Sequence, residues 1–131
     1  MKFKTINNNR ILGKVILGKQ LGRTFNIPTA NIVIKNGLFE TGVYISQIEI
    51  YGVLYNSISN VGVSPTFSDD NILKVETHIF DFSSDIYDLD VEVFLIEKIR
   101  DEINFNSVDE FLSQVRKDIE FSKRYFKVVK K

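Results

Sequence analysis

The hydrophobic and polar positions follow one rhythm over the first three quarters of the chain and another over the last quarter. Val, Ile, Tyr, Phe and Thr gather in short runs separated by Gly, Pro, Asn and Asp, a pattern typical of β-strands joined by turns. Alternation within the runs is imperfect, which suits strands that curve in a small closed sheet. Six segments share this composition and are predicted as strands: Leu12–Leu17, Ile27–Ile34, Gly42–Ile50, Val53–Asn60, Lys74–Phe82 and Val91–Ile96.

The last quarter has a helical period. Ser107 and Glu110 stand three positions apart, which is the spacing of a capping box that satisfies the first-turn amides of a helix. We therefore expect a mainly β fold: a small closed antiparallel barrel of six strands, Greek-key-like, with one C-terminal amphipathic helix. The apolar stripe of this helix is expected to be core. It consists of Val108, Phe111, Leu112, Val115, Ile119, Ser122 and Phe126.

Composition narrows the class of protein. The chain has 131 residues, which fits one domain over residues 1–131, and 17 basic residues balance 17 acidic ones. This balance opposes a general nucleic-acid binder, so no nucleic-acid partner is expected. No apolar run approaches the ~20 residues of a membrane span, and no secretory leader pattern follows Met1. The lack of an apolar run leads us to expect no membrane partner. The chain has no cysteine, which favours a reducing compartment, and we expect a cytoplasmic protein.

Two segments carry candidate phosphate chemistry. Gly13–Gln20 nearly matches a P-loop, but its last position lacks the hydroxyl that ligates magnesium, and the segment is predicted as strand. The following loop contains Gly18, Gly22 and Arg23, whose backbone amides and charge could meet phosphate oxygens. From this loop alone, a solvated turn between two strands is the favoured interpretation.

A Thr and an Asn stand two positions apart in the next predicted strand. Thr29 and Asn31 would therefore point to the same face, and their neutral oxygens suit Mg²⁺ bound to nucleotide phosphates. Pro28 disfavours helix at Ile27 and keeps the segment extended. An edge strand with polar residues facing water is the alternative from spacing alone.

Several motifs in a fixed order resemble the riboflavin kinase family, over nearly the whole chain. That family has G-x-V-x-x-G, a Gly-rich loop, P-T-A-N, G-V-Y, N-I-G-x-x-P-T-F, V-E-x-H-I-x-D-F and R-x-E-x-x-F. The matching segments here are Gly13–Gly18, Gly22-Arg23, Pro28–Asn31, Gly42–Tyr44, Asn60–Phe67, Val75–Phe82 and Arg100–Phe105. Asn26 and Asp88 depart from the family pattern, which has Gly at both positions. In many bacteria this domain is the C-terminal half of a bifunctional enzyme with FMN adenylyltransferase.

The resemblance implies ATP-dependent phosphorylation of the riboflavin ribityl 5′-hydroxyl, giving FMN and ADP. It implies that Thr29 and Asn31 hold Mg²⁺ and that Glu76 is the general base. A monomer that acts on riboflavin and ATP is expected, either alone or as part of a larger bifunctional chain. The residues implied to bind nucleotide are Gly18, Gly22, Arg23, Thr29, Asp81 and Tyr87.

The resemblance also implies a flap that covers the flavin. Arg100, Glu102 and Phe105 would form it before the C-terminal helix, although packing at the helix entry explains them too. Without the family, Glu76 reads as a solvent-facing strand residue. His78 is expected to be structural or to support a neighbour through a hydrogen bond. A barrel that binds flavin or nucleotide without catalysis, and an oligonucleotide-binding barrel, are the alternative functions.

Overall fold

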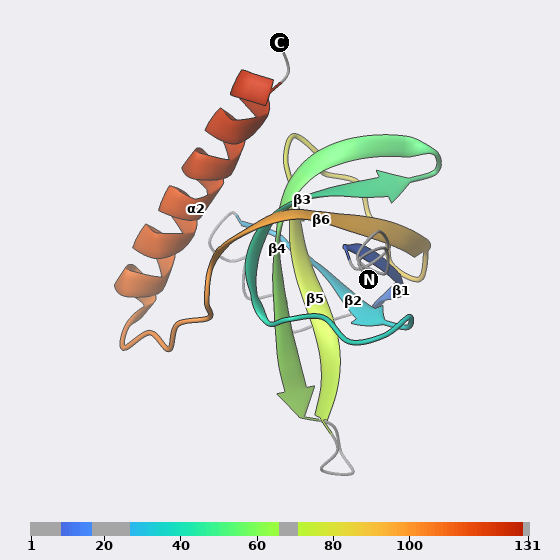
Figure 1. Ribbon diagram of the computed structural model, residues 1–131, viewed down its shortest axis with the longest axis horizontal. Coiled ribbons are helices and arrows are strands. Elements are labelled where there is room, and N and C mark those ends of the chain that lie inside the picture. The colour runs from blue at the N-terminus through green and yellow to red at the C-terminus, as the bar shows by residue number, and fades with distance from the viewer. Residues whose placement is uncertain (1–8, 17–26, 66–70, 130–131) are drawn as a thin grey trace, which may run out of the picture.

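A computed structural model describes residues 9–16, 27–65 and 71–129 of the chain. Within these ranges it has six strands and one helix (Figure 1). The elements are β1 Arg10–Ile16, β2 Ala30–Ile34, β3 Gly42–Ile50, β4 Val53–Pro65, β5 Asn71–Ile79, β6 Asp90–Arg100 and α2 Val108–Val129.

The strands form one closed antiparallel barrel in the order β1-β2-β5-β4-β3-β6, with β6 pairing back onto β1. β3 and β4 are a hairpin, whereas β2 pairs with β5, far along the chain. The predicted closed six-stranded antiparallel barrel with one C-terminal helix is therefore confirmed. β5 ends at Ile79, earlier than predicted, because Asp81 turns the chain with a positive φ of 56°.

The barrel interior is filled mainly by Ile and Val, which suit the crowded inner face of curved strands. Buried residues alternate with exposed ones, as where Val75 and Thr77 flank the exposed Glu76 on β5. The fully buried apolar members of this core are Ile11, Ile32, Ile48, Val61, Val75 and Val93.

Four buried hydroxyl groups cross this apolar interior as a continuous hydrogen-bonded chain. Ser46 Oγ lies 2.8 Å from Ser57 Oγ and 2.7 Å from Ser59 Oγ, and Ser59 Oγ lies 2.8 Å from Thr77 Oγ1. All four residues are at most 1% exposed. Because each hydroxyl can donate and accept, the chain satisfies polar groups that would otherwise be costly to bury.

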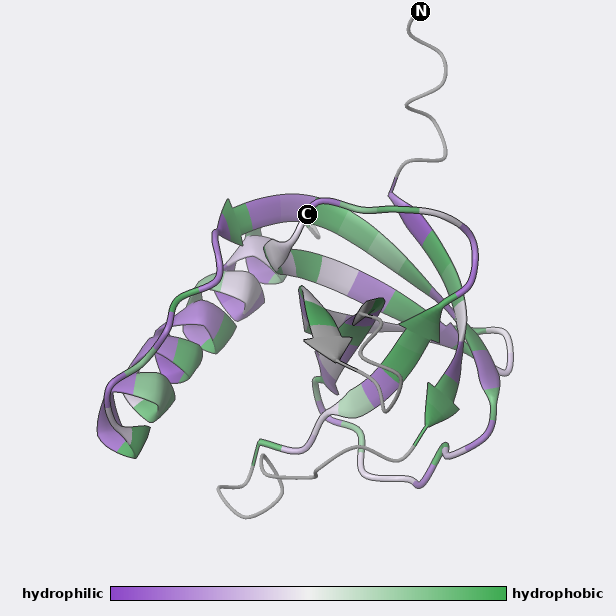
Figure 2. Cartoon of the chain, turned by 90° about the horizontal axis from the view of Figure 1, so that it is seen from below, coloured by the Kyte–Doolittle hydropathy of each residue, from purple (hydrophilic) through white to green (hydrophobic). Residues whose placement is uncertain are grey.

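The helix α2 packs along the outside of the barrel (Figures 1 and 2). Ser107 begins it as predicted, since its Oγ accepts a hydrogen bond from the Glu110 amide at 3.1 Å. The Glu110 carboxylate accepts from Asn106 N at 3.1 Å, one residue earlier than the capping-box pattern expects. In the described part of the chain, no helix is long and apolar enough to span a membrane.

The predicted apolar stripe of α2 is only partly core. Ile119 and Phe126 pack on a small cluster formed by Val43, Ile58 and Phe80 on the outer face of the barrel. At the start of the helix, by contrast, Val108 is 52% exposed and Phe111 is 37% exposed. The apolar stripe therefore contacts the barrel in the later part of the helix and remains exposed at its start. The buried residues of α2 in the described part of the chain are Asp118, which is 6% exposed, and Ser122, which is fully buried.

Candidate active site

A single row of residues, one from each strand, runs around the outer face of the barrel. Its members are paired by strand register, each with the next, through five consecutive pairings. We call it the outer row, and its members in spatial order are Ile16, Asn31, Glu76, Asn60, Val43 and Arg100. Residues directly opposite in antiparallel strands have Cβ atoms about 5 Å apart, so neighbours in the outer row can act on one ligand.

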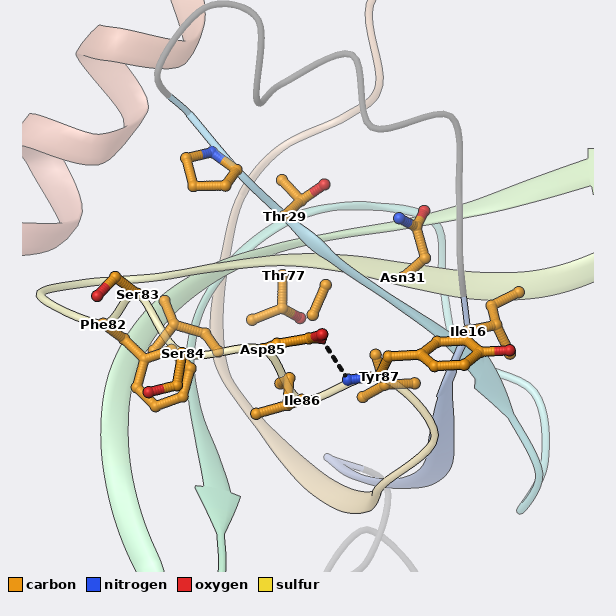
Figure 3. A pocket seen from close by; sticks show the side chains of 14 residues that line it. Ile16, Thr29, Asn31, Thr77, Phe82, Ser83, Ser84, Asp85, Ile86 and Tyr87 are labelled. Atoms are coloured by element: carbon orange, nitrogen blue, oxygen red, sulfur yellow. Dashed lines mark hydrogen bonds between the residues drawn. The ribbon is translucent and has the colours of Figure 1, made fainter.

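A cavity of about 390 Å³ opens beside the Ile16–Asn31 end of the outer row (Figure 3). The end of β1, the start of β2, the end of β5 and the following segment 82–87 surround it. Its lining joins apolar side chains, such as Ile86 and Phe82, to hydroxyl, amide and carboxylate groups. A cavity of this size and mixed lining suits a small molecule with both polar and apolar parts.

Thr29 and Asn31 both line this cavity, and Figure 3 shows their side chains on the same side of β2. Asn31 is only 5% exposed, although it lies on the outer face of its strand. These two neutral oxygens fit Mg²⁺, which takes few protein ligands and completes its shell with water and phosphate oxygens. No cluster of three or more His, Cys, Asp or Glu side chains suited to a metal occurs among the described residues.

Glu76 lies on β5 directly opposite Asn31 on one side and Asn60 on the other. Its side chain is exposed between the buried Val75 and Thr77, so it projects from the outer face. Glu76 is therefore next to the cavity through Asn31, without lining it. This places a carboxylate one strand away from the predicted metal ligand, in reach of a ligand that extends along the outer row.

Tyr87 forms part of the cavity wall and is 51% exposed. Its backbone amide donates a hydrogen bond to Asp85 Oδ1 at 3.0 Å, which fixes the turn of the segment (Figure 3). Asp81 is exposed in the turn after β5 and is not part of the cavity lining. Of the two residues predicted to bind nucleotide in this region, Tyr87 lies at the cavity and Asp81 lies beyond it.

Arg100 ends the outer row and connects the barrel to α2. Its Nε and a terminal nitrogen donate to Asp118 Oδ2 at 3.0 and 2.8 Å, and Gln114 Nε2 donates to Asp118 Oδ1 at 2.9 Å. The guanidinium carbon also lies 6.0 Å from the centre of the Phe105 ring, and that ring packs edge-on against Phe111. Arg100 is thus held at the helix entry mainly by its hydrogen bonds to Asp118, while the Phe105 side chain is partly exposed and Glu102 is exposed.

Glu102 and its neighbour Asp101 lie close to different strands, β4 and β6 respectively. A methyl group on Gly62 of β4 would come within 2.6 Å of Glu102 Oε2, so glycine at this position lets the carboxylate lie close to the strand. Asp101 Oδ1 lies 2.6 Å from the Lys98 ammonium, and this hydrogen bond lowers the pKa of Asp101 and raises the pKa of Lys98. Glu102 therefore lies over β4, whereas Asp101 is bound to β6 and Arg100 is bound to α2.

Some predicted residues lie outside the described residues: Gly18, Gly22 and Arg23, and with them the second half of the P-loop-like pattern. His78, in contrast, has a defined partner. Its Nδ1 donates to the Pro28 carbonyl oxygen at 2.7 Å, which links β5 to the segment that leads into β2. This agrees with the supporting role expected for the histidine.

Sequence reasoning missed the hydroxyl groups of the cavity. Thr77, Ser83 and Ser84 line it, and Thr77 is also the last member of the buried hydroxyl chain. A signal was present, because Ser59 and Thr77 occupy positions whose neighbours two residues away, Val61 and Val75, are core residues. Small polar residues at interior positions of a strand indicate a buried polar contact.

The fold and site define a small antiparallel barrel with a ligand cavity at one end and a carboxylate beside it. A family model described as riboflavin kinase matches residues 6–126. The chain therefore belongs to the riboflavin kinase family.

Known proteins resemble the chain over most of its length. A bifunctional riboflavin kinase/FMN adenylyltransferase of Buchnera aphidicola is 42% identical over 123 residues, which cover 92% of this chain and 39% of that protein. A crystal structure titled as a macrolide-efflux protein from Streptococcus pneumoniae has a TM-score of 0.79 and 35% identity, covering 87% of this chain and 38% of that one.

A riboflavin kinase from Trypanosoma brucei shares the fold. Its TM-score is 0.59 at 21% identity, with 90% of this chain and 79% of that chain covered. The chain spans only 39% of the Buchnera relative, so the comparison with that relative concerns one part of a longer protein.

Proposed function

We propose that the protein transfers the γ-phosphate of ATP to the 5′-hydroxyl of riboflavin, giving FMN and ADP. The observation that carries this proposal is the pairing of Asn31 with Glu76 beside a small-molecule cavity, in a chain of the riboflavin kinase family. Phosphoryl transfer depends mainly on positioning and on offsetting charge, and it needs an acceptor for the hydroxyl proton. The outer row places a predicted metal ligand, Asn31, directly beside a carboxylate that can accept the proton, Glu76.

On this proposal the nucleotide occupies the cavity, with Tyr87 beside its apolar part and Thr29 toward its phosphates. Asp81, Gly18, Gly22 and Arg23 stay predictions for nucleotide binding. Thr29 and Asn31 hold Mg²⁺, which offsets phosphate charge when bound. The two side chains fix the phosphate end of the donor next to Glu76.

Glu76 then accepts the proton of the 5′-hydroxyl as the oxygen of that hydroxyl bonds to the γ-phosphorus. The bond from the γ-phosphorus to the bridging oxygen breaks, and ADP leaves with that oxygen. Arg100, Glu102 and Phe105 cover the flavin, whose ring can stack on the guanidinium or the aromatic face. These residues lie on the far side of Glu76 from the cavity, so donor and acceptor approach from opposite ends of the outer row.

The proposal extends to the surroundings of the enzyme. We infer a monomer in the cytoplasm that acts on riboflavin and ATP without a nucleic-acid partner. A second domain in a longer chain would fit the length of the bifunctional relative.

The test is incubation of the protein with riboflavin, ATP and Mg²⁺, followed by chromatographic detection of FMN and ADP. Equal amounts of both products are expected, and omission of Mg²⁺ should abolish them. Flavin or nucleotide binding without ADP release would instead identify a binding module. Salt-dependent affinity for single strands would favour the oligonucleotide-binding alternative.

A further inference from the structure

Asn60 lies between the two groups of residues proposed for the reaction. In the outer row it is the neighbour of Glu76 on one side and of Val43, which α2 covers, on the other. Along β4 its same-face neighbours are Ile58, beneath the helix, and Gly62, beneath Glu102. It is therefore surrounded by the base, the helix and the flap.

The carboxamide of Asn60 projects from the outer face. Ser59 and Val61 on either side are 1% and 0% exposed and face the interior, whereas Asn60 is exposed. A ligand that lies along the outer row from Asn31 across Glu76 must next meet Asn60, because neighbouring strands are about 4.8 Å apart.

The acceptor substrate presents matching chemistry at this place. Its reacting hydroxyl ends a polyol chain, so the next carbon carries a secondary hydroxyl that both donates and accepts hydrogen bonds. A carboxamide has an N–H donor and a carbonyl acceptor on one rigid group, which can serve such a hydroxyl without adding charge beside Glu76. Val43, the next member of the outer row, has no polar atom to offer.

We propose that Asn60 is a substrate-binding residue that hydrogen-bonds the secondary hydroxyl next to the phosphorylated one. This rests on the proposed function and deepens it. Through that contact Asn60 positions the terminal hydroxyl over Glu76 and selects acceptors that carry a polyol chain. The donor nucleotide, at the other side of Glu76, does not touch Asn60.

The experiment combines a protein variant with a substrate variant. Initial rates are measured for the parent and Asn60→Ala, each with riboflavin and with 4′-deoxyriboflavin, at saturating ATP. Asn60→Ala should lower kcat/KM for riboflavin about 5- to 30-fold, as expected for a lost hydrogen bond, and leave the KM for ATP unchanged. With the deoxy acceptor the variant and the parent should agree within about 2-fold, because the contact is absent in both.

Asn56→Ala is the matched control. Asn56 lies four residues away on the same face of β4, and its side chain is hydrogen-bonded to Gln47 at 2.9 Å. This control should show the parent's rates with both acceptors. If Asn60→Ala does not fold by circular dichroism, Asn60→Val, which keeps strand propensity and has no polar side-chain atom, takes its place in the same comparison.

The experiment distinguishes a failure of the role proposed for Asn60 from a failure of the proposed function. An active parent whose Asn60 variant loses the same factor with both acceptors, or nothing with riboflavin, overturns the role of Asn60 alone. A parent that forms no FMN overturns the proposed function and this inference with it.

Discussion

Glu76 shows how much a single position depends on its neighbours across the sheet. The alternation of Thr29 and Asn31 was readable from spacing, because residues two apart on a strand share a face. Their closeness to Glu76 was not, since it arises from the pairing of β2 with β5, which are distant along the chain. The shared face of Thr29 and Asn31 was therefore predictable from spacing, whereas the role of Glu76 is implied by the family resemblance and its closeness to Asn31 comes from the strand pairing.

The first prediction concerns the proposed base. Glu76→Gln keeps the shape of the side chain and removes the proton acceptor, so kcat should fall about 10²–10⁴-fold. Binding of riboflavin and ATP should persist, as measured by fluorescence quenching and calorimetry. Glu76→Ala also removes the orienting oxygen and should be at least as slow. Turnover of the Gln variant within a few-fold of the parent would show that another group accepts the proton.

The second prediction concerns the metal ligands. Thr29→Ala and Asn31→Ala each remove one neutral oxygen, so the apparent affinity for Mg²⁺–ATP should fall about 10-fold or more. Titration of ATP at fixed Mg²⁺ measures this, with Thr41→Ala, an exposed residue before β3, as the control. Unchanged ATP affinity in both site variants would contradict the assignment.

At the scale of elements, α2 illustrates a local prediction that holds while a tertiary one fails. The start of the helix follows from Ser107, whose hydroxyl accepts the Glu110 amide. The apolar stripe was expected to be core throughout, yet Val108 and Phe111 remain exposed. Periodicity states which residues share a face, but not how much of that face the barrel reaches.

The third prediction concerns this helix start. Ser107→Ala removes the acceptor for a first-turn amide and should lower the free energy of unfolding by about 1 kcal/mol. Urea denaturation monitored by far-ultraviolet circular dichroism measures the loss. Ser113→Ala, an exposed position within α2, should be neutral or slightly stabilising, because alanine is the better helix former.

The fourth prediction concerns the flap. Phe105→Ala removes the ring beside Arg100 and should raise the KM for riboflavin about 5-fold or more, while the KM for ATP stays unchanged. Phe121→Ala, at a 48% exposed site on α2, is the control and should alter neither constant. If Phe105→Ala changes only the thermal midpoint, this turn contributes packing alone.

At the scale of the whole molecule, the barrel was predictable because runs of β-branched residues separated by turn residues indicate its strands. The strand ends were less predictable. β5 ends at Ile79 because the chain turns at Asp81, which has a positive φ, and no pattern in the sequence indicated this turn. The polar interior was also missed, because Ser46 and Ser57 are read as ordinary strand residues until β3 and β4 bring them together. Pairing information of this kind is absent from local patterns.

The fifth prediction concerns that polar interior. Ser59→Ala leaves Ser46 and Thr77 each without one buried partner, so the barrel should lose about 1–3 kcal/mol of stability. Chemical denaturation followed by tyrosine fluorescence measures it, with the exposed Ser83→Ala as the control. A loss within 0.5 kcal/mol would mean that water or a rotated hydroxyl replaces the missing contact.

The limited burial of α2 against the barrel has a consequence for partial unfolding. Its buried residues, Asp118 and Ser122, carry a carboxylate and a hydroxyl, and the apolar side chains of Ile119 and Phe126 are only half-buried. Detaching the helix exposes the small outer cluster of Val43, Ile58 and Phe80, while the barrel keeps its larger interior core and all its strand pairings. In native-state hydrogen exchange the amides of α2 should open well before those of β4 and β5. Each such opening would also release the guanidinium of Arg100, so the acceptor end of the outer row would loosen while the cavity at its other end stays intact.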